Sequence, residues 1–293
     1  MPEIFVSTFP FGRADETPLR LLDASGYTIT RNPHQRKLKA TELAELAREA
    51  DGLIAGTEDL KPLLAANSKL KCISRVGIGL DSVPLAQCRE RGITVCYTPD
   101  AVTMAVAELA LGLMITLPRQ VTRADREIRV GRWQRHYGPR VQDAVIGLIG
   151  FGRVGQNVAR MLAPLLPQLI LVNDIQDRSD AIAGAARESG LSIEAAGKDR
   201  IYAEADIISL HTPLSPATRG MITGAELAGM KPTAYLINTA RGGLVDEAAL
   251  HLALREERLA GAALDVFEEE PYSGPLGEVE NIVLTQHMGS CSY

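Results

Sequence analysis

The chain has 293 residues, of which 46% are hydrophobic and 23% are charged, with a formal net charge of −5. These values fit two globular domains of ordinary size. Lys and Arg are scattered, so we expect neither a nucleic acid nor a membrane surface as partner. Four cysteines without a C-x-x-C pair or zinc-like spacing predict no metal site. The first ten residues lack a signal-peptide pattern and the longest apolar stretch, 109–117, is too short for a bilayer, so we expect a cytoplasmic location.

The first third of the chain alternates between short apolar runs and helical patterns. Strands are predicted at 4–7, 27–30, 52–56, 71–74 and 93–96, with helices at 18–25, 40–50, 61–66 and 84–91. Such alternation is typical of βαβ units around a mainly parallel sheet. We therefore predict an α/β domain over residues 1–97.

Two helices should follow, at 101–117 and 119–132. The first is apolar nearly all round, which predicts that it is buried. After them the alternation resumes. Strands are predicted at 144–149, 169–173, 206–210, 234–238, 261–267 and 281–285, with helices at 153–163, 180–188, 199–204, 224–229 and 246–257. A second α/β domain is therefore predicted over residues 98–293.

The strand at 144–149 runs into a glycine pattern that is typical of dinucleotide sites. Gly150 allows a tight turn, Gly152 lets the backbone approach a pyrophosphate, and Gly155 lets the following helix pack closely. The N-terminus of that helix offers free N–H groups to phosphates. The next strand ends in Asp174, nineteen residues beyond Gly155, where a carboxylate can bind ribose hydroxyls and repel a 2′-phosphate. These residues predict NAD rather than NADP, although Arg178 lies nearby.

Three polar residues follow predicted strands in the second domain: Arg241, Glu270 and His287. Hydride transfer to a 2-keto acid needs a cation for the substrate, a general acid, and a neighbour that keeps the acid charged. Arginine, histidine and glutamate suit these tasks. Ligands in open α/β sheets bind beyond the carboxyl ends of the strands, so the placement is favourable.

The chain resembles the D-isomer-specific 2-hydroxyacid dehydrogenases, especially the D-3-phosphoglycerate dehydrogenase-like members. The similar segments follow the family's order and cover nearly the whole chain. They are SRVGIGLD (74–81), TPDAVTMAVAELALGLM (98–114), GLIGFGRVG (147–155), ISLHTPLSPATRGMI (208–222), LINTARGGLVDEAAL (236–250), AALDVFEEEP (262–271) and LTQHMGS (284–290).

This resemblance implies a flavodoxin-like substrate domain followed by a Rossmann-type NAD-binding domain. It also implies a homodimer or homotetramer, with the segment near 101–140 contributing to the dimer. Arg241 would bind substrate, His287 would be the acid/base with Glu270 paired to it, and the N–H groups of Val76 and Gly77 would hold the substrate carboxylate. The residues implied to line NAD are Thr103, Gly150, Gly152, Arg153, Val154, Gly155, Asp174, His211, Thr212, Pro213, Thr218, Ala240, Asp265 and Gly289.

Three features depart from the family pattern. Gln286 stands where a proline commonly precedes the histidine. Thr57 and Glu58 follow the third strand, where phosphoglycerate-specific members tend to carry arginine, which argues against a phosphorylated substrate. The sequence ends six residues after His287, whereas the family usually continues into a helix that crosses back to the first domain. We therefore expect weaker domain closure and a less ordered His287 region.

These features predict an NAD-dependent oxidoreductase acting on a small 2-keto or D-2-hydroxy acid of the 3-phosphoglycerate, hydroxypyruvate or glyoxylate type. One alternative is an NAD-sensing, corepressor-like module without turnover. Another is a related oxidoreductase acting on formate or phosphite. The set of Arg241, Glu270 and His287 argues against the first alternative, and Glu270 argues against a formate enzyme.

Overall fold

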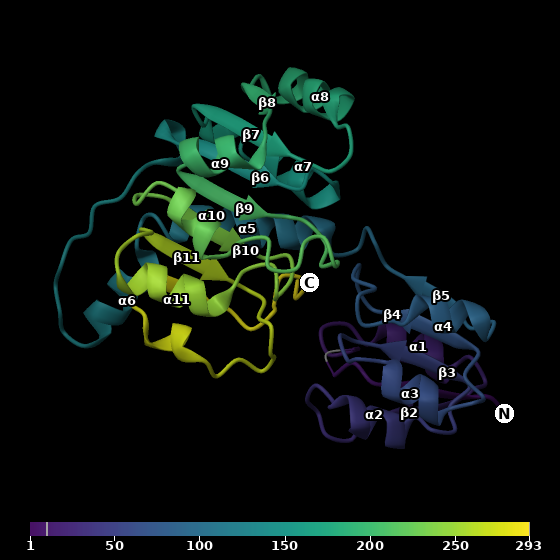
Figure 1. The fold of residues 1–293 in the computed structure, drawn as a ribbon. Coiled ribbons are helices and arrows are strands. Elements are labelled where there is room, and N and C mark those ends of the chain that lie inside the picture. The colour runs from purple at the N-terminus through teal and green to yellow at the C-terminus, as the bar shows by residue number, and fades with distance from the viewer. Residues whose placement is uncertain (10, 293) are drawn as a thin grey trace. The chain divides into compact units, whose positions relative to one another are not determined.

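A computed structural model describes residues 1–9 and 11–292 of the chain. The chain divides into two compact units, Met1–Val102 and Thr103–Ser292. The division therefore follows Val102, whereas the sequence indicated a boundary after residue 97. Each unit is an α/β domain with its own parallel sheet, so the predicted fold class is confirmed (Figure 1).

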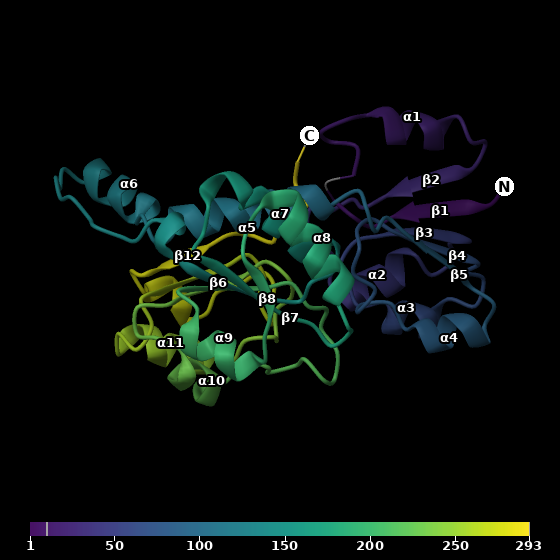
Figure 2. The same ribbon diagram turned by 90° about the horizontal axis from the view of Figure 1, so that it is seen from above.

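The first unit holds a five-stranded parallel sheet in the order β2-β1-β3-β4-β5, which is the flavodoxin-like order. Its strands are β1 (Glu3–Val6), β2 (Thr28–Arg31), β3 (Gly52–Ala55), β4 (Cys72–Arg75) and β5 (Thr94–Tyr97). Its helices are α1 (Thr17–Asp23), α2 (Ala40–Leu46), α3 (Lys61–Ala66) and α4 (Leu85–Glu90). Helix α1 lies on one face of the sheet and α2, α3 and α4 lie on the other (Figure 2). Phe5, Leu53 and Ile73, from the three central strands, form the middle of its core.

The second unit holds a seven-stranded parallel sheet in the order β12-β11-β10-β9-β6-β7-β8. Its strands are β6 (Val145–Ile149), β7 (Leu169–Asn173), β8 (Ile193–Ala195), β9 (Ile207–Leu210), β10 (Tyr235–Asn238), β11 (Gly261–Leu264) and β12 (Ile282–Leu284). Every residue of β9, β10 and β11 is buried, as expected for parallel strands covered on both faces. The direction of strand addition reverses between β6 and β9, and such a switch point is where open α/β sheets bind ligands.

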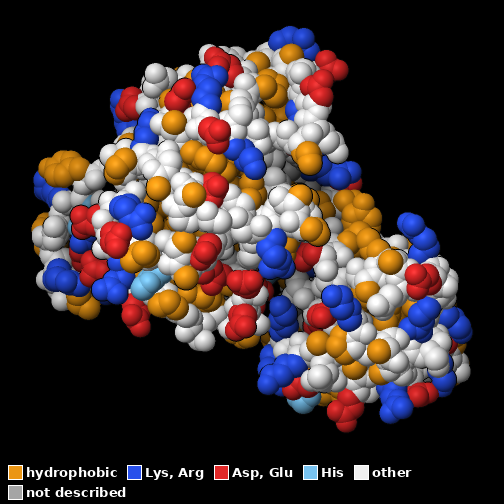
Figure 3. All heavy atoms as spheres, in the orientation of Figure 1, with side chains coloured by type: hydrophobic (Ala, Val, Ile, Leu, Met, Phe, Trp, Pro, Cys, Tyr) orange, Lys and Arg blue, Asp and Glu red, His pale blue; other side chains and the backbone are white. Residues whose placement is uncertain are grey.

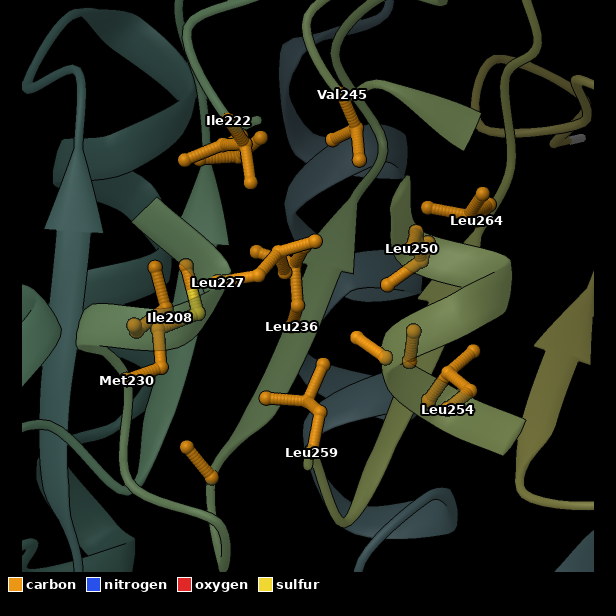
Figure 4. Packing of buried hydrophobic residues seen from close by; sticks show 14 of the residues in the cluster. Ile208, Ile222, Leu227, Met230, Leu236, Val245, Leu250, Leu254, Leu259 and Leu264 are labelled. Carbon is orange, nitrogen blue, oxygen red and sulfur yellow. The ribbon is translucent and has the colours of Figure 1, made fainter. Parts of the chain in front are cut away.

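Helices cover both faces of this second sheet. The helices α5 (Thr103–Thr116), α7 (Arg153–Met161) and α8 (Ser179–Ser189) lie on one face, and α9 (Lys198–Glu204), α10 (Gly224–Gly229) and α11 (Glu247–Arg255) lie on the other (Figure 2). Figure 4 shows the core under the second group, where Leu227 and Leu250 from the helices meet Ile208, Leu236 and Leu264 from the strands. Short 3₁₀ turns, η1 (Val141–Asp143), η2 (Ala163–Leu165) and η3 (Pro275–Glu278), complete the unit.

Helix α5 differs from the expectation of full burial. Ala107, Ala110 and Met114 are buried between the sheet and α7, but Met104 and Ile115 on the other side are 50% and 39% exposed. Although the α5 sequence is apolar on all sides, the chain itself buries only one side of the helix.

The helix predicted at 119–132 is shorter, because α6 spans Val121–Arg129 and Gln120 before it adopts a left-handed φ of 53°. We call α6 and the following segment 130–140 the arm, and it extends away from the sheet of the second unit (Figures 1 and 2). In the described residues, no single helix is long and apolar enough to cross a membrane. The helices α5 and α6 are long and apolar enough for a membrane span only when they are taken together, and the two are bent by 66° at the break between them.

Candidate active site

The three predicted catalytic residues follow three neighbouring strands. Arg241 lies just beyond β10, Glu270 beyond β11 and His287 beyond β12. Because these strands are parallel and adjacent, their carboxyl ends meet at one edge of the sheet. The fold therefore brings all three residues to the edge where ligands bind.

His287 and Glu270 form a close pair at this edge. Nδ1 of His287 lies 2.9 Å from Oε1 and 2.9 Å from Oε2 of Glu270. The side chains are 30% and 17% exposed, so the pair is partly shielded from water. With Nδ1 donating its proton to the carboxylate, Nε2 is left to exchange a proton with a ligand, and His287 makes no other side-chain hydrogen bond within the described residues.

Asp265, which is 1% exposed, fixes the segment that carries His287. Its Oδ1 accepts hydrogen bonds from the Thr285 hydroxyl at 2.6 Å and from the Met288 N–H at 2.9 Å. Its Oδ2 accepts one from the Gly289 N–H at 2.9 Å. Sequence reasoning gave Asp265 and Gly289 only a cofactor role and missed this clamp, although an aspartate directly after a buried strand is a recognisable sign of one.

The turn that carries Arg241 is fixed by Asn238. The Asn238 amide donates to the Arg241 carbonyl at 2.8 Å, and its Oδ1 accepts from the Ala240 N–H at 3.0 Å. Gly242 follows, and a Cβ there would lie 1.8 Å from the Phe267 carbonyl oxygen. Only glycine therefore lets the Arg241 turn lie against the segment that leads to Glu270.

The glycine fingerprint joins β6 to α7 in the predicted manner. Gly150 has a φ of 100°, and a Cβ on Gly155 would lie 2.3 Å from the Gly150 carbonyl oxygen. A Cβ on Gly152 would meet nothing within 4 Å, so its backbone faces open space. Arg153 and Val154 form the first turn of α7, and the N-terminus of a helix suits a pyrophosphate. The residues present therefore fit a dinucleotide.

Asp174, which follows β7, is tied to the same turn. Its Oδ2 accepts from the Phe151 N–H at 2.8 Å and lies 3.3 Å from Nε of Arg178. Its Oδ1 accepts from the Gln176 N–H at 2.9 Å. Burial alone would raise the pKa of Asp174, but the Gln176 and Phe151 N–H groups and the Arg178 charge outweigh it and hold the pKa below its usual value. The carboxylate is therefore ionised at neutral pH beside the fingerprint.

The remaining predicted cofactor residues lie at the start of α5 or beyond β9 and β10. Both ring nitrogens of His211 are buried without a hydrogen-bond partner among the described residues, and burial lowers its pKa to about 4. The Thr218 hydroxyl donates to the Pro213 carbonyl at 2.7 Å and so fixes the loop that contains Thr212. Thr103 is the first residue of α5, and Ala240 precedes Arg241.

The predicted substrate contacts of the first unit, Val76 and Gly77, lie in the loop that follows β4. The N–H of Val76 donates to the Ala55 carbonyl at 2.9 Å, which extends the β3–β4 ladder. The N–H of Gly77 donates to the Thr98 hydroxyl at 2.8 Å. The next two N–H groups, of Ile78 and Gly79, meet no acceptor within the described part of the chain. The Val76 and Gly77 N–H groups thus bond within the first unit, and their contact with a substrate carboxylate stays a prediction.

Comparison with known proteins finds relatives of one dehydrogenase family. Residues 111–289 match the model of the D-isomer specific 2-hydroxyacid dehydrogenase NAD binding domain. Over 86% of its length the chain is 38% identical to a glyoxylate reductase from Thermofilum pendens, 75% of which is covered. It is 34% identical to a D-3-phosphoglycerate dehydrogenase from Synechocystis, but spans only 45% of that protein.

A solved structure is similar along the whole fold. The NADPH-dependent glyoxylate/hydroxypyruvate reductase from Sinorhizobium meliloti, in complex with NADP and malonate, superposes with a TM-score of 0.83 at 28% identity. The superposition covers 99% of this chain and 88% of that one.

Proposed function

The chain belongs to the D-isomer specific 2-hydroxyacid dehydrogenase family, and from this we propose that it interconverts a small 2-keto acid and its D-2-hydroxy acid with NAD(H). The observation that carries the proposal is the 2.9 Å contact between His287 and Glu270 at the sheet edge that also carries Arg241. A site that only senses NAD needs no such acid/base pair.

In this proposal each polar residue has one task. Nε2 of His287 donates a proton to the carbonyl oxygen as the keto acid becomes a hydroxy acid, and removes it in the reverse direction. Glu270 orients the imidazole through Nδ1 and stabilises its charged form. The Arg241 guanidinium polarises the carbonyl and attracts the anionic substrate.

The first unit is the substrate domain and the second is the cofactor domain. The loop after β4 receives the substrate carboxylate at Val76 and Gly77, where the Ala55 carbonyl and the Thr98 hydroxyl fix the backbone. When bound, the nicotinamide supplies or accepts the hydride. The fingerprint glycines and the first turn of α7 hold the pyrophosphate, while Asp174 receives the ribose hydroxyls.

NAD is the preferred cofactor, because the ionised Asp174 would repel the 2′-phosphate of NADP. Nε of Arg178 lies 3.3 Å from Oδ2 of Asp174, and its positive charge reduces the preference for NAD without reversing it. The related reductase from Sinorhizobium meliloti uses NADPH, so the family accommodates both cofactors. A cytoplasmic location, where this chemistry has its cofactor and substrates, remains a prediction.

The enzyme works as a homodimer or a higher homo-oligomer. In a single chain the arm leaves Val130, Trp133 and Tyr137 exposed by 67%, 81% and 90%. Hydrophobic side chains are visible along the arm's outer edge at the left of Figure 3. Met104 and Ile115 of α5 are also exposed, and a second copy would cover exposed apolar side chains of this kind.

The direct test is a panel of NADH oxidation assays with glyoxylate, hydroxypyruvate and 3-phosphohydroxypyruvate. We expect turnover of at least one of these acids. Tight NADH binding without turnover of any 2-keto acid would favour a sensing module instead.

A further inference from the structure

The loop that carries Glu270 is closed by two stacked aromatic rings. Phe267 and Tyr272 lie on either side of Glu270 in the sequence, and their rings stack with centroids 4.3 Å apart at an interplanar angle of 22°. Phe267 follows β11, and Tyr272 precedes the 3₁₀ turn η3. The stack therefore joins the two ends of residues 267–272, which we call the Glu270 loop.

Phe267 connects the Glu270 loop to the residues of the proposed chemistry. Its N–H donates to Oε1 of Glu270 at 3.3 Å, and the same oxygen lies 2.9 Å from Nδ1 of His287. Its carbonyl oxygen would lie 1.8 Å from a Cβ on Gly242, the residue after Arg241. The position of Phe267 therefore helps to set where both the Glu270 carboxylate and the Arg241 turn lie.

Tyr272 fixes the far end of the Glu270 loop. Its hydroxyl oxygen accepts a hydrogen bond at 3.1 Å from the N–H of Leu276, a residue of η3 that is fully buried. A Cβ on Gly274 would lie 2.5 Å from this oxygen, so the backbone turns closely around the tyrosine. Burial raises the pKa of the Tyr272 hydroxyl above its already high ordinary value, although the Leu276 N–H opposes the shift. The hydroxyl therefore stays protonated at neutral pH.

The Glu270 loop is acidic, so its shape needs support that does not come from charge. Glu268, Glu269 and Glu270 are consecutive. Glu247 of α11 accepts a hydrogen bond from the Glu268 N–H at 2.7 Å, and burial, followed by the charges of Glu268 and Glu269, raises the pKa of Glu247. Arg219 pairs with Glu268 at 3.2 Å, but both side chains are mostly exposed, and such pairs contribute little. The aromatic stack is therefore the main support of this loop.

We propose that Tyr272 is a positioning residue, which by stacking on Phe267 holds the Glu270 carboxylate against Nδ1 of His287 and so keeps the imidazole oriented and charged for proton donation. The inference rests on the proposed function and assigns a further residue to that site. Stacked aromatic pairs are favoured by about two- to tenfold beyond the burial of their area, which is enough to change how often the loop holds Glu270 in place.

The test compares three variants in keto-acid reduction. Tyr272→Leu keeps an apolar side chain but removes the ring, and Tyr272→Phe keeps the ring but removes the hydroxyl. Tyr202→Leu is the matched control, because Tyr202 of α9 is buried against the same core but lies outside the loop. We expect Tyr272→Leu to lower kcat by about fivefold, with an unchanged NADH Kd, and Tyr272→Phe and Tyr202→Leu to stay within about twofold of the wild type.

The pH dependence distinguishes positioning from ordinary packing. Reduction needs the charged imidazole, so activity falls as the pH rises. A weaker contact with the Glu270 carboxylate disfavours that charge. Tyr272→Leu should therefore move the alkaline midpoint of kcat/KM to lower pH by about half a unit, in the same direction as Glu270→Gln. A midpoint that stays at the wild-type pH in Tyr272→Leu would overturn the proposal, even if Tm is lower.

The protonation of His287 can also be followed without turnover. An NMR titration follows the five histidines, and a His287→Asn variant identifies the signal of His287. We expect the midpoint of His287 alone to move to lower pH in Tyr272→Leu, and no midpoint to move in Tyr202→Leu. If no 2-keto acid is turned over, the proposed function fails, and this titration still tests the contact. An unchanged His287 midpoint in Tyr272→Leu, or an equal change in Tyr202→Leu, would identify Tyr272 as a packing residue only.

Discussion

Glu270 contacts His287 with both carboxylate oxygens, each 2.9 Å from Nδ1. His287 itself has a left-handed φ of 51°, which residues other than glycine adopt rarely. The backbone is held there because the His287 N–H donates to the Asp265 carbonyl at 2.7 Å and the Asp265 carboxylate accepts from Met288 and Gly289. Two acidic residues thus cooperate, one orienting the ring and the other fixing its backbone.

The open space beside Gly152 leads to a prediction about the cofactor. Gly152→Ala should weaken NADH binding by about tenfold or more while Tm stays unchanged, because its Cβ would meet no protein atom but would project toward the pyrophosphate. Fluorescence titration with NADH and a thermal melt measure both quantities. Gly184→Ala is the control, since it also has open space but lies in α8, and equal NADH affinity in the two variants would contradict the account.

Asp174 should control the choice of cofactor. Asp174→Ser removes the charge that repels a 2′-phosphate and leaves Arg178 free to attract it, so the ratio of the NADPH and NADH dissociation constants should fall by about tenfold or more. Asp177→Ser, in the same loop but exposed, is the matched control. A ratio that stays the same in Asp174→Ser would show that other residues choose the cofactor.

His211 should make the second domain sensitive to acid. In the folded chain its pKa is lowered by burial from 6.5 to about 4, so between these values the unfolded chain binds more protons than the folded one. This contribution to stability is complete above about pH 6.5 and falls by up to about 3 kcal/mol as the pH drops to about 4. Urea unfolding followed by circular dichroism measures this slope. His211→Asn should flatten it, the exposed His34→Asn should not, and equal slopes in both would contradict the burial argument.

The arm should govern assembly. Trp133→Ser combined with Tyr137→Ser removes two of the most exposed aromatic side chains and should shift the protein toward monomer in analytical ultracentrifugation. Leu252→Ser, 50% exposed on α11, is the control and should leave assembly unchanged. A wild type that is monomeric at micromolar concentration would contradict the assignment of this surface to a second copy.

Strong local patterns made most of the fold predictable. The apolar runs at β6, β9 and β10 are buried on both faces, so each reads as an uninterrupted hydrophobic segment. Strand β8 was missed because it is three residues long, lies at the sheet edge and buries only Ile193. A run with one buried residue leaves no periodic pattern to detect.

The sequence identified which residues form the site, but it did not predict the hydrogen bonds that these residues make. Arg241, Glu270 and His287 were identified because each follows a strand whose end reaches the ligand edge. The sequence could not tell which N–H groups of the β4 loop remain open, because that depends on where the β3–β4 ladder ends and on the Thr98 hydroxyl. The clamp by Asp265 likewise depends on contacts between segments about twenty residues apart.

We propose that His287, held by Glu270, is the proton donor for keto-acid reduction. The most direct measurement is kcat for NADH oxidation with the best 2-keto acid in the wild type, in His287→Ala and in Glu270→Gln, together with the NADH Kd of each. We predict that kcat falls by about 100-fold or more in His287→Ala and by a smaller factor in Glu270→Gln, with the NADH Kd within about threefold of the wild type in both. A His287→Ala variant that keeps wild-type kcat while binding NADH normally would contradict the account.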